Sequence, residues 1–232
     1  MTYLPKIRYL TPAYKNMIMD DNAYHPIIRG RMVDMYWIMK HMDLPSNALI
    51  LEFGAWPCDN WRLALQRWTN LQITDSFGWL NGRTLPGTPT RAEWEAPLVG
   101  FGIPTYELDV QTLDVLERYD GIYSISVLEH VINDETGLKN IYNALVPGGW
   151  FVFTVEMNPY VGMEYDNDIW FRVYKQDYLV DMLHQVGFEV NGDAEAHEDF
   201  DEQFKAAIGA PHLLRLPYKH FVSAGVAARK PL

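Results

Sequence analysis

The chain has 232 residues, 48% hydrophobic and 21% charged, which is the composition of a soluble globular protein with one sizeable core. Its formal net charge of -11 argues against binding to nucleic acid or to anionic membranes, which requires clustered Lys and Arg, and favours a small or cationic substrate. The single Cys58 excludes an internal disulfide and a cysteine-rich metal site. Neither a signal-peptide core nor an apolar stretch of about 18 residues occurs, so we expect a cytoplasmic protein; the oligomeric state is left open.

An amphipathic helix is predicted near the N-terminus, where apolar residues recur at helical spacing from Ile27 to Met42. We interpret residues 1–47 as an N-terminal helical extension whose helix covers the core of the following domain. A lid over a substrate is the less favoured alternative, because apolar stripes of this period usually pack against a core.

From residue 48 to 232 the pattern changes to short apolar runs that alternate with helical segments, which predicts one domain with a parallel sheet. Strands are expected at 48–53, 71–74, 104–108, 122–127, 150–155, 188–191 and 221–227, and helices at 60–68, 138–145 and 175–185. Two glycine- or aromatic-rich stretches, 76–103 and 157–174, are expected to be irregular loops.

The first strand of this domain ends in Glu52, Phe53 and Gly54 just before a helical stretch. In doubly wound sheets such a turn seats a nucleotide-like cofactor, because a small residue lets the main chain approach the ligand. Only Gly54 stands where a full Gly-x-Gly-x-x-Gly motif has three glycines, so a tight turn without a ligand explains this segment equally well.

Three later segments make the pattern more specific: Tyr119–Val131, Leu145–Thr154 with its Pro-Gly-Gly turn, and Arg172–Val190 with its Gly-Phe-Glu-Val end. Together they resemble the class I S-adenosylmethionine-dependent methyltransferases, over roughly residues 46–230. The resemblance implies an α/β, doubly wound, mostly parallel seven-stranded Rossmann-like sheet whose last strand, Phe221–Ala227, is antiparallel.

The resemblance also implies S-adenosylmethionine as cofactor and a role for each matched residue. Asp75, 23 residues after Glu52, would bind the ribose hydroxyls, and Asp109 would accept from the adenine amine. Glu52 would bind the ammonium group. The remaining expected cofactor contacts are Gly54, Ala55 and Trp56 in the first turn, Ser76 and Val110 beside the two acids, and Ser126 and Val127 near the sulfonium. Each acid taken singly is better explained as a loop residue or a helix cap, and it is the joint position of the acids along the chain that favours the cofactor roles.

Trp56 and Cys58 depart from the family pattern, since they stand at the second and third glycine positions. Trp56 either forms a wall for the methionine end of the cofactor or blocks the pocket.

His130 is the candidate general base for methyl transfer to a hydroxyl, since it follows the fourth strand and an imidazole titrates near neutral pH. The alternative is a structural role, such as a cap or a bond to a loop carbonyl. Glu129 and His130 match two ligands of a metal-binding run in some related O-methyltransferases, but Ser126 replaces the first acid and no metal site is predicted.

We therefore expect O- or N-methylation of a small-molecule or saccharide acceptor. The main alternative is a non-catalytic relative that keeps the fold as a binding surface. A nicotinamide dehydrogenase is the third hypothesis, although it would require glycines at 56 and 58 to hold a pyrophosphate.

Overall fold

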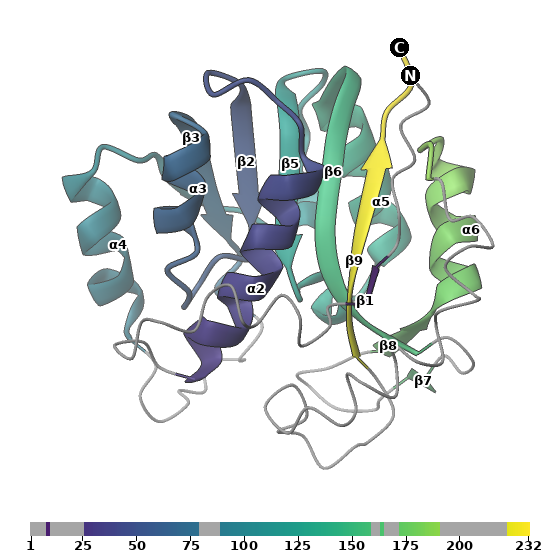
Figure 1. The fold of residues 1–232 in the computed structure, drawn as a ribbon, viewed down its shortest axis with the longest axis horizontal. Helices are drawn as coiled ribbons and strands as arrows, with labels where there is room; N and C mark the ends of the chain where they lie inside the picture. The colour runs from purple at the N-terminus through teal and green to yellow at the C-terminus, as the bar shows by residue number, and fades with distance from the viewer. Residues whose placement is uncertain (1–7, 10–25, 79–88, 159–162, 165–171, 191–221) are drawn as a thin grey trace.

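A mostly parallel sheet with helices on both faces organises the chain (Figure 1). The structure is a computed structural model that describes residues 8–9, 26–78, 89–158, 163–164, 172–190 and 222–232. The strands are β1 (Arg8–Tyr9), β2 (Leu49–Phe53), β3 (Asn70–Asp75), β4 (Thr105–Glu107), β5 (Tyr119–Ile125), β6 (Leu145–Asn158), β7 (Met163–Glu164), β8 (Arg172–Lys175) and β9 (Val222–Arg229). The α-helices are α2 (Pro26–His41), α3 (Trp61–Arg67), α4 (Arg91–Gly100), α5 (Asp134–Ala144) and α6 (Gln176–Val186), with short 3-10 turns η1 (Val110–Thr112) and η2 (Leu128–His130).

The main path of the sheet has the strand order β1-β9-β6-β5-β2-β3-β4, and β8 and β7 branch from β6. Strands β2 to β6 pair in parallel, whereas β9 runs antiparallel to β6. This confirms the predicted mostly parallel sheet with an antiparallel last strand; the main path has seven strands, and β7 and β8 bring the described sheet to nine. From β2 the chain proceeds outward to β3 and β4, then returns to β5 on the other side of β2, so the strand order reverses between β2 and β5.

Several predicted elements differ in the structure. The strand expected at 188–191 is reduced, within the described residues, to one bridge between Glu189 and Arg229, and β1 occupies the neighbouring edge of β9. Strand β5 begins at Tyr119 rather than Ile122, and β6 at Leu145 rather than Trp150.

The stretch 76–103 is not wholly irregular, because it contains α4. A capping box between Thr90 and Glu93 starts this helix, while Pro97 and the glycines at its end obscure its periodicity in the sequence. The stretch 157–174 likewise contains β7 and the first residues of β8, and its other residues lie largely outside the described part.

Two apolar layers enclose the sheet. Helices α5 and α6 pack on one face through Leu138, Ile141 and Leu183, while α2, α3 and α4 cover the other. The ring of Trp37 in α2 lies so close to β9 that a Cβ on Gly225 would stand 2.5 Å from it. Trp37 has no exposed surface, so the prediction that this helix covers the core is confirmed. The division of the chain at residue 47 stays a prediction.

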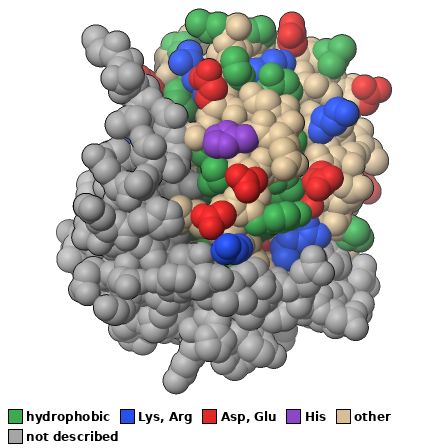
Figure 2. All heavy atoms as spheres, turned by 90° about the vertical axis from the view of Figure 1, so that its right-hand side faces the viewer, with side chains coloured by type: hydrophobic (Ala, Val, Ile, Leu, Met, Phe, Trp, Pro, Cys, Tyr) green, Lys and Arg blue, Asp and Glu red, His purple; other side chains and the backbone are tan. Residues whose placement is uncertain are grey.

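The outer face near α6 is mixed in character. Figure 2 shows this side, where acidic, basic and hydrophobic side chains of the described residues lie interspersed. Across the described part of the chain, every helix is too short or too polar to cross a membrane.

Candidate cofactor and active site

The carboxyl ends of four parallel strands meet at one edge of the sheet. Strand β2 ends at Phe53, β3 at Asp75, β4 at Glu107 and β5 at Ile125, and their pairing places these ends side by side. All the predicted cofactor residues lie at these ends or in the turns that follow. Because the strand order reverses here, this edge is where doubly wound sheets bind ligands.

Gly54 forms the turn after β2 with a left-handed backbone, at φ +71°. A Cβ built on Gly54 would stand 2.5 Å from Cγ1 of Val127, in the turn after β5. From sequence, either close approach of a cofactor or a tight turn without a ligand explains this glycine, and in the structure the left-handed turn and the close approach of Val127 both require it. The next residue, Ala55, is buried and donates its amide to the carbonyl of Thr74 at 3.2 Å. The first turn is therefore packed against both neighbouring strand ends.

Two backbone amides hold the carboxylate of Asp75. Oδ2 accepts from the amide of Trp56 at 2.9 Å, and Oδ1 accepts from the amide of Phe77 at 2.6 Å. The residue is only 2% exposed, and burial raises the pKa of Asp75 to about 6 although these bonds and the charge of Arg91 act in the opposite direction. The group is therefore mainly ionised at neutral pH. Because a carboxylate offers about four lone-pair sites, about two remain for other donors.

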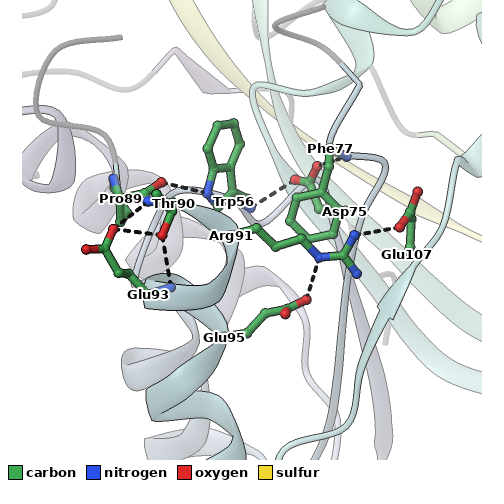
Figure 3. A network of polar contacts seen from close by, with 9 residues as sticks. All are labelled: Trp56, Asp75, Phe77, Pro89, Thr90, Arg91, Glu93, Glu95 and Glu107. Carbon is green, nitrogen blue, oxygen red and sulfur yellow. Dashed lines mark hydrogen bonds and ion pairs between the residues drawn. The ribbon is translucent and has the colours of Figure 1, made fainter. Parts of the chain in front are cut away.

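The start of α4 is joined to this acid through Trp56, Phe77 and Arg91 (Figure 3). The indole of Trp56 donates to the carbonyl of Pro89 at 3.3 Å, and its ring lies 6.3 Å from that of Phe77. The guanidinium of Arg91 stacks 4.0 Å over the Phe77 ring and binds Glu107 at 2.5 Å. Both ends of the connection from β3 to α4 are thus anchored beside Asp75, while residues 79–88 lie outside the described part.

Glu52 is a second buried acid, and its side chain lies on the face of β2 that α2 and α3 cover. Its Oε2 accepts from the hydroxyl of Tyr123 at 2.6 Å, and the residue is 2% exposed. The pKa of Glu52 is raised to about 8, mainly by burial; the bond from Tyr123 acts in the opposite direction, and the charge of Asp75 adds to the rise. The groups that shift this pKa include a hydroxyl and another acid but no cation. Glu52 is therefore mainly protonated at neutral pH, and a cation beside it would favour the ionised form.

Asp109 follows β4 and forms the N-cap of η1. Its Oδ1 accepts from the amide of Gln111 at 2.9 Å, and the side-chain Nε2 of Gln111 also donates to Oδ2 at 2.9 Å. The side-chain Oε1 of Gln111 accepts from the backbone amide of Asn133, the N-cap of α5, at 2.8 Å. Val110 is buried in the core on the α5 side, and the hydroxyl of Ser76 accepts from a backbone amide at 3.4 Å. A capping role for Asp109 is thus present, and its contact with adenine stays a prediction.

The turn after β5 carries the remaining candidates. Ser126 has a left-handed backbone, at φ +50°, and donates its amide to the carbonyl of Thr154 at 2.9 Å. His130 ends η2 half-buried, and its amide donates to the carbonyl of Val127 at 2.8 Å. The structure thus places His130 one short turn from Val127, while the chemical role of its imidazole stays a prediction. The described residues contain no group of three or more His, Cys, Asp or Glu side chains suited to a metal ion.

Two sets of side-chain contacts in this region were not predicted from the sequence. Tyr123 is the partner of Glu52, and Arg172 and Tyr174 of β8 contact Asp134 at the start of α5. A signal was present, because residues two apart on a strand share a face, but nothing in the sequence says which segment that face meets.

S-adenosylmethionine carries a sulfonium, an ammonium group, a ribose and an adenine, and the three acids of this site have the chemistry to bind the last three. Asp75 is an oriented, mainly ionised acceptor with lone pairs to spare, as ribose hydroxyls require. Glu52 is a buried acid without a cationic neighbour among the groups that shift its pKa, which suits an ammonium group. Asp109 is half-buried, with carboxylate oxygens next to the end of β4. The residues present therefore fit this cofactor.

Comparisons with known proteins agree with this fit. The sequence profile described as "Methyltransferase domain" matches residues 42–191, which is well over half of the chain. No curated protein matches the sequence.

Solved structures with the same fold include the [4+2]-cyclase SpnF, with a TM-score of 0.61 and 19% identity over 92% of this chain and 86% of that one. A Burkholderia thailandensis 1,6-didemethyltoxoflavin-N1-methyltransferase with bound S-adenosylhomocysteine has a TM-score of 0.55 and 18% identity over 92% and 94%. A Haemonchus contortus phosphoethanolamine N-methyltransferase 2, also with S-adenosylhomocysteine, has a TM-score of 0.59 and 14% identity over 85% of this chain and 52% of that one. By its sequence profile and its sheet, the chain belongs to the class I S-adenosylmethionine-dependent methyltransferases.

Proposed function

We propose that this protein transfers the methyl group of S-adenosylmethionine to a small-molecule or saccharide acceptor. The observation that carries the proposal is the meeting of Gly54, Asp75, Asp109 and Val127 at the switch point of the sheet. Each of these residues stands at the end of a different parallel strand, where the family holds its cofactor.

When bound, S-adenosylmethionine supplies an electrophilic methyl group on a sulfonium. Asp75 accepts hydrogen bonds from the ribose, with Ser76 beside it, and Asp109 accepts from the adenine amine, with Val110 beside it. Glu52 pairs with the ammonium group, and the turn of Gly54, Ala55 and Trp56 borders the amino-acid end. Ser126 and Val127 line the floor below the sulfonium. These roles are supported by the position, burial and bonding of each residue described above.

His130 is proposed to take the proton from an acceptor hydroxyl. A positioned base contributes roughly 10²- to 10⁴-fold to rate, whereas an amine that is already a good nucleophile needs only alignment. Loss of turnover in His130→Ala on that scale would therefore indicate O-methylation, and near-normal turnover would indicate N-methylation.

A small acceptor is supported by the net charge of -11, which disfavours polyanionic partners, and by the methyltransferases of small molecules among the similar structures. Those structures are less than 25% identical to this chain, so they do not identify its acceptor.

One observation favours the second candidate, a non-catalytic binding protein. Asp75 is nearly covered and already accepts two bonds from the backbone amides of Trp56 and Phe77, as an acid retained for folding alone would do.

Calorimetry with S-adenosylmethionine, S-adenosylhomocysteine and NAD separates the hypotheses, and Asp75→Ala tests the site. We expect the variant to weaken S-adenosylhomocysteine at least about 10-fold, because a charge-assisted hydrogen bond contributes roughly 1.5 to 3 kcal/mol. Asp114→Ala is the matched control, since Asp114 is an exposed acid beyond η1. Binding of both S-adenosyl ligands, followed by mass-spectrometric detection of methylated amines, phenols or sugars, would support the enzyme. Failure to bind either ligand, or equal affinity in the two variants, would contradict the proposed site.

A further inference from the structure

Two side chains of β8 hold the connection between β5 and α5. Arg172 forms an ion pair with Asp134, the first residue of α5, and its Nη2 donates to the carbonyl of Ile132 at 2.9 Å. The hydroxyl of Tyr174 lies 2.7 Å from Oδ2 of Asp134 and 3.2 Å from the carbonyl of Leu128. Strand β8 itself is parallel to the end of β6, so both side chains start from the sheet.

The contacts among Arg172, Asp134 and Tyr174 are largely shielded from water, whereas the bond from Arg172 to Ile132 lies at the surface. The side chains of Arg172 and Asp134 are 17% and 9% exposed, and Tyr174 is 1% exposed. Burial and the charge of Asp134 raise the pKa of Tyr174 well above its usual value, so the hydroxyl keeps its proton and acts as a donor. A hydroxyl has a single proton, so the bonds of Tyr174 to Asp134 and to Leu128 are alternatives, and either one ties β8 to the connection between β5 and α5. Polar contacts with so little exposure are screened weakly, which makes them strong restraints on the connection.

The two carbonyls stand on either side of His130, since Leu128 is two residues before it and Ile132 is two residues after it. The backbone of His130 is further tied to Val127 through its own amide. Glu129, the intervening residue, is fully buried, and its charge contributes to the raised pKa of Tyr174, so the two lie near each other.

We propose that Tyr174 and Arg172 form a clamp, that is, a pair of positioning residues for methyl transfer that hold His130 at the carboxyl end of β5 by fixing the backbone on both sides of it. This inference rests on the proposed function, in which His130 acts on the acceptor. Neither residue needs to touch the acceptor or the cofactor for this role. Their effect reaches the reaction through the orientation of one turn, and misplacement by about 1 Å can lower a rate by about 100-fold.

The test compares Tyr174→Phe with Tyr119→Phe. Tyr119 lies at the opposite end of the same sheet, is also buried, and donates its hydroxyl to Gln72 at 3.1 Å, so its variant loses a similar bond away from the site. Tyr174→Phe is expected to lower kcat by roughly 10-fold and to leave the Kd for S-adenosylhomocysteine within about 2-fold. Amide hydrogen exchange of residues 128–132 should speed up and the imidazole NMR signals of His130 should shift, both in the protein without ligand. Tyr119→Phe should change none of these readouts.

Arg172→Lys gives a second variant, because it keeps the charge beside Asp134 but lacks the planar fork that reaches Ile132. Arg172→Lys should show the same faster amide exchange of residues 128–132 and the same shift of the His130 imidazole signals as Tyr174→Phe, relative to the parent with Arg172. Each change is then repeated in His130→Ala. Loss of the kcat effect in that background would support the proposal, whereas an undiminished further loss would overturn it, since the clamp would then act through something other than His130.

The two proposals fail in different ways. If His130→Ala keeps normal turnover, the assignment of the base is wrong, and the clamp is judged on hydrogen exchange and the His130 signals alone. A change in Tyr174→Phe but not in Tyr119→Phe would still show that the clamp holds this turn. Identical spectra and exchange rates in the two variants would overturn it.

Discussion

Cofactor binding is expected to release a proton from Glu52. In the free protein this carboxyl is buried, bonded to Tyr123, and has a pKa of about 8. An ammonium group placed beside it favours the ionised form, because an opposite charge within a few ångströms lowers the pKa of an acid. The proton that Glu52 carries at neutral pH must then leave the complex.

The size of the effect follows from the pKa. With a pKa of about 8, Glu52 is about 90% protonated at pH 7, half protonated at pH 8 and nearly ionised at pH 9. Full ionisation in the complex therefore releases about 0.9 proton at pH 7, about 0.5 at pH 8 and about 0.1 at pH 9. Asp75, with a pKa of about 6, adds no more than about 0.1 proton at pH 7.

Isothermal titration calorimetry in buffers with different enthalpies of ionisation measures this number directly, with S-adenosylhomocysteine as ligand. Adenosine is the matched ligand control, since it keeps the ribose and adenine but lacks the ammonium group, and it should release about 0.1 proton or less. Glu52→Gln should bind without the pH-dependent release. Tyr123→Phe removes the bond that lowers the pKa of Glu52, so its release at pH 8 should rise from about half a proton toward one.

Equal proton release by S-adenosylhomocysteine and adenosine would refute the reasoning, because the ammonium group would then have no part in it. Release that persists unchanged in Glu52→Gln would assign the proton to another group. Either result would remove Glu52 from the cofactor site and leave it as a buried acid of the core.

Three further predictions concern stability and the adenine contact. Because the pKa of Glu52 is raised, the folded state binds one more proton than the unfolded state between about pH 4.5 and 8, and the free energy of unfolding of the parent falls as pH rises through this window. The free energy of unfolding of Glu52→Gln should therefore rise relative to the parent by roughly 1.4 kcal/mol per pH unit. Equal differences at pH 5 and pH 8 in denaturant unfolding would contradict this. Gly54→Ala should lose roughly 2 to 4 kcal/mol in urea unfolding, from its left-handed backbone and its contact with Val127, and Val127→Ala in the same chain should recover part of the loss; no recovery would mean that the backbone alone is responsible. Asp109→Ala should weaken S-adenosylhomocysteine roughly 10-fold and an analogue without the adenine amine much less, whereas equal losses would show that Asp109 does not contact that amine.

The positions and the parallel direction of the central strands could be predicted from sequence, because their apolar runs are short, bounded by turn residues and separated by helical segments. The same logic failed at α4, where Pro97 and flanking glycines mask the helical period, and at 188–191, where a buried Phe188 and Val190 make a strand-like pattern that forms a single bridge. Local pattern reports which residues are buried, but it does not report how many partners a segment at the sheet edge finds.

The sequence predicts where the site residues lie along the chain, but it does not predict which groups their side chains contact. Asp75 and Asp109 follow their strands as expected, yet the partners of their carboxylates, the amide of Trp56 and the side chain of Gln111, depend on how turns fold over the strand ends. Glu52 illustrates the limit most clearly. Its place at the tip of β2 was evident, but its burial against Tyr123 depends on the register of β2 with β5, which no residue near Glu52 encodes.

One contact links the two halves of the site. Val127 occupies the space that a side chain on Gly54 would need, and its carbonyl accepts the amide of His130. The turn that borders the cofactor and the turn that carries the proposed base are therefore in direct contact, while Tyr174 holds the second turn from the side of β8. A reaction that depends on aligning a methyl group with an acceptor gains from this arrangement, because the relative placement of the two turns is determined by packing within the protein before either ligand arrives. Gly54 is thus required for the seat of Val127, and in the proposed function the same glycine also lets the main chain pass beside the cofactor.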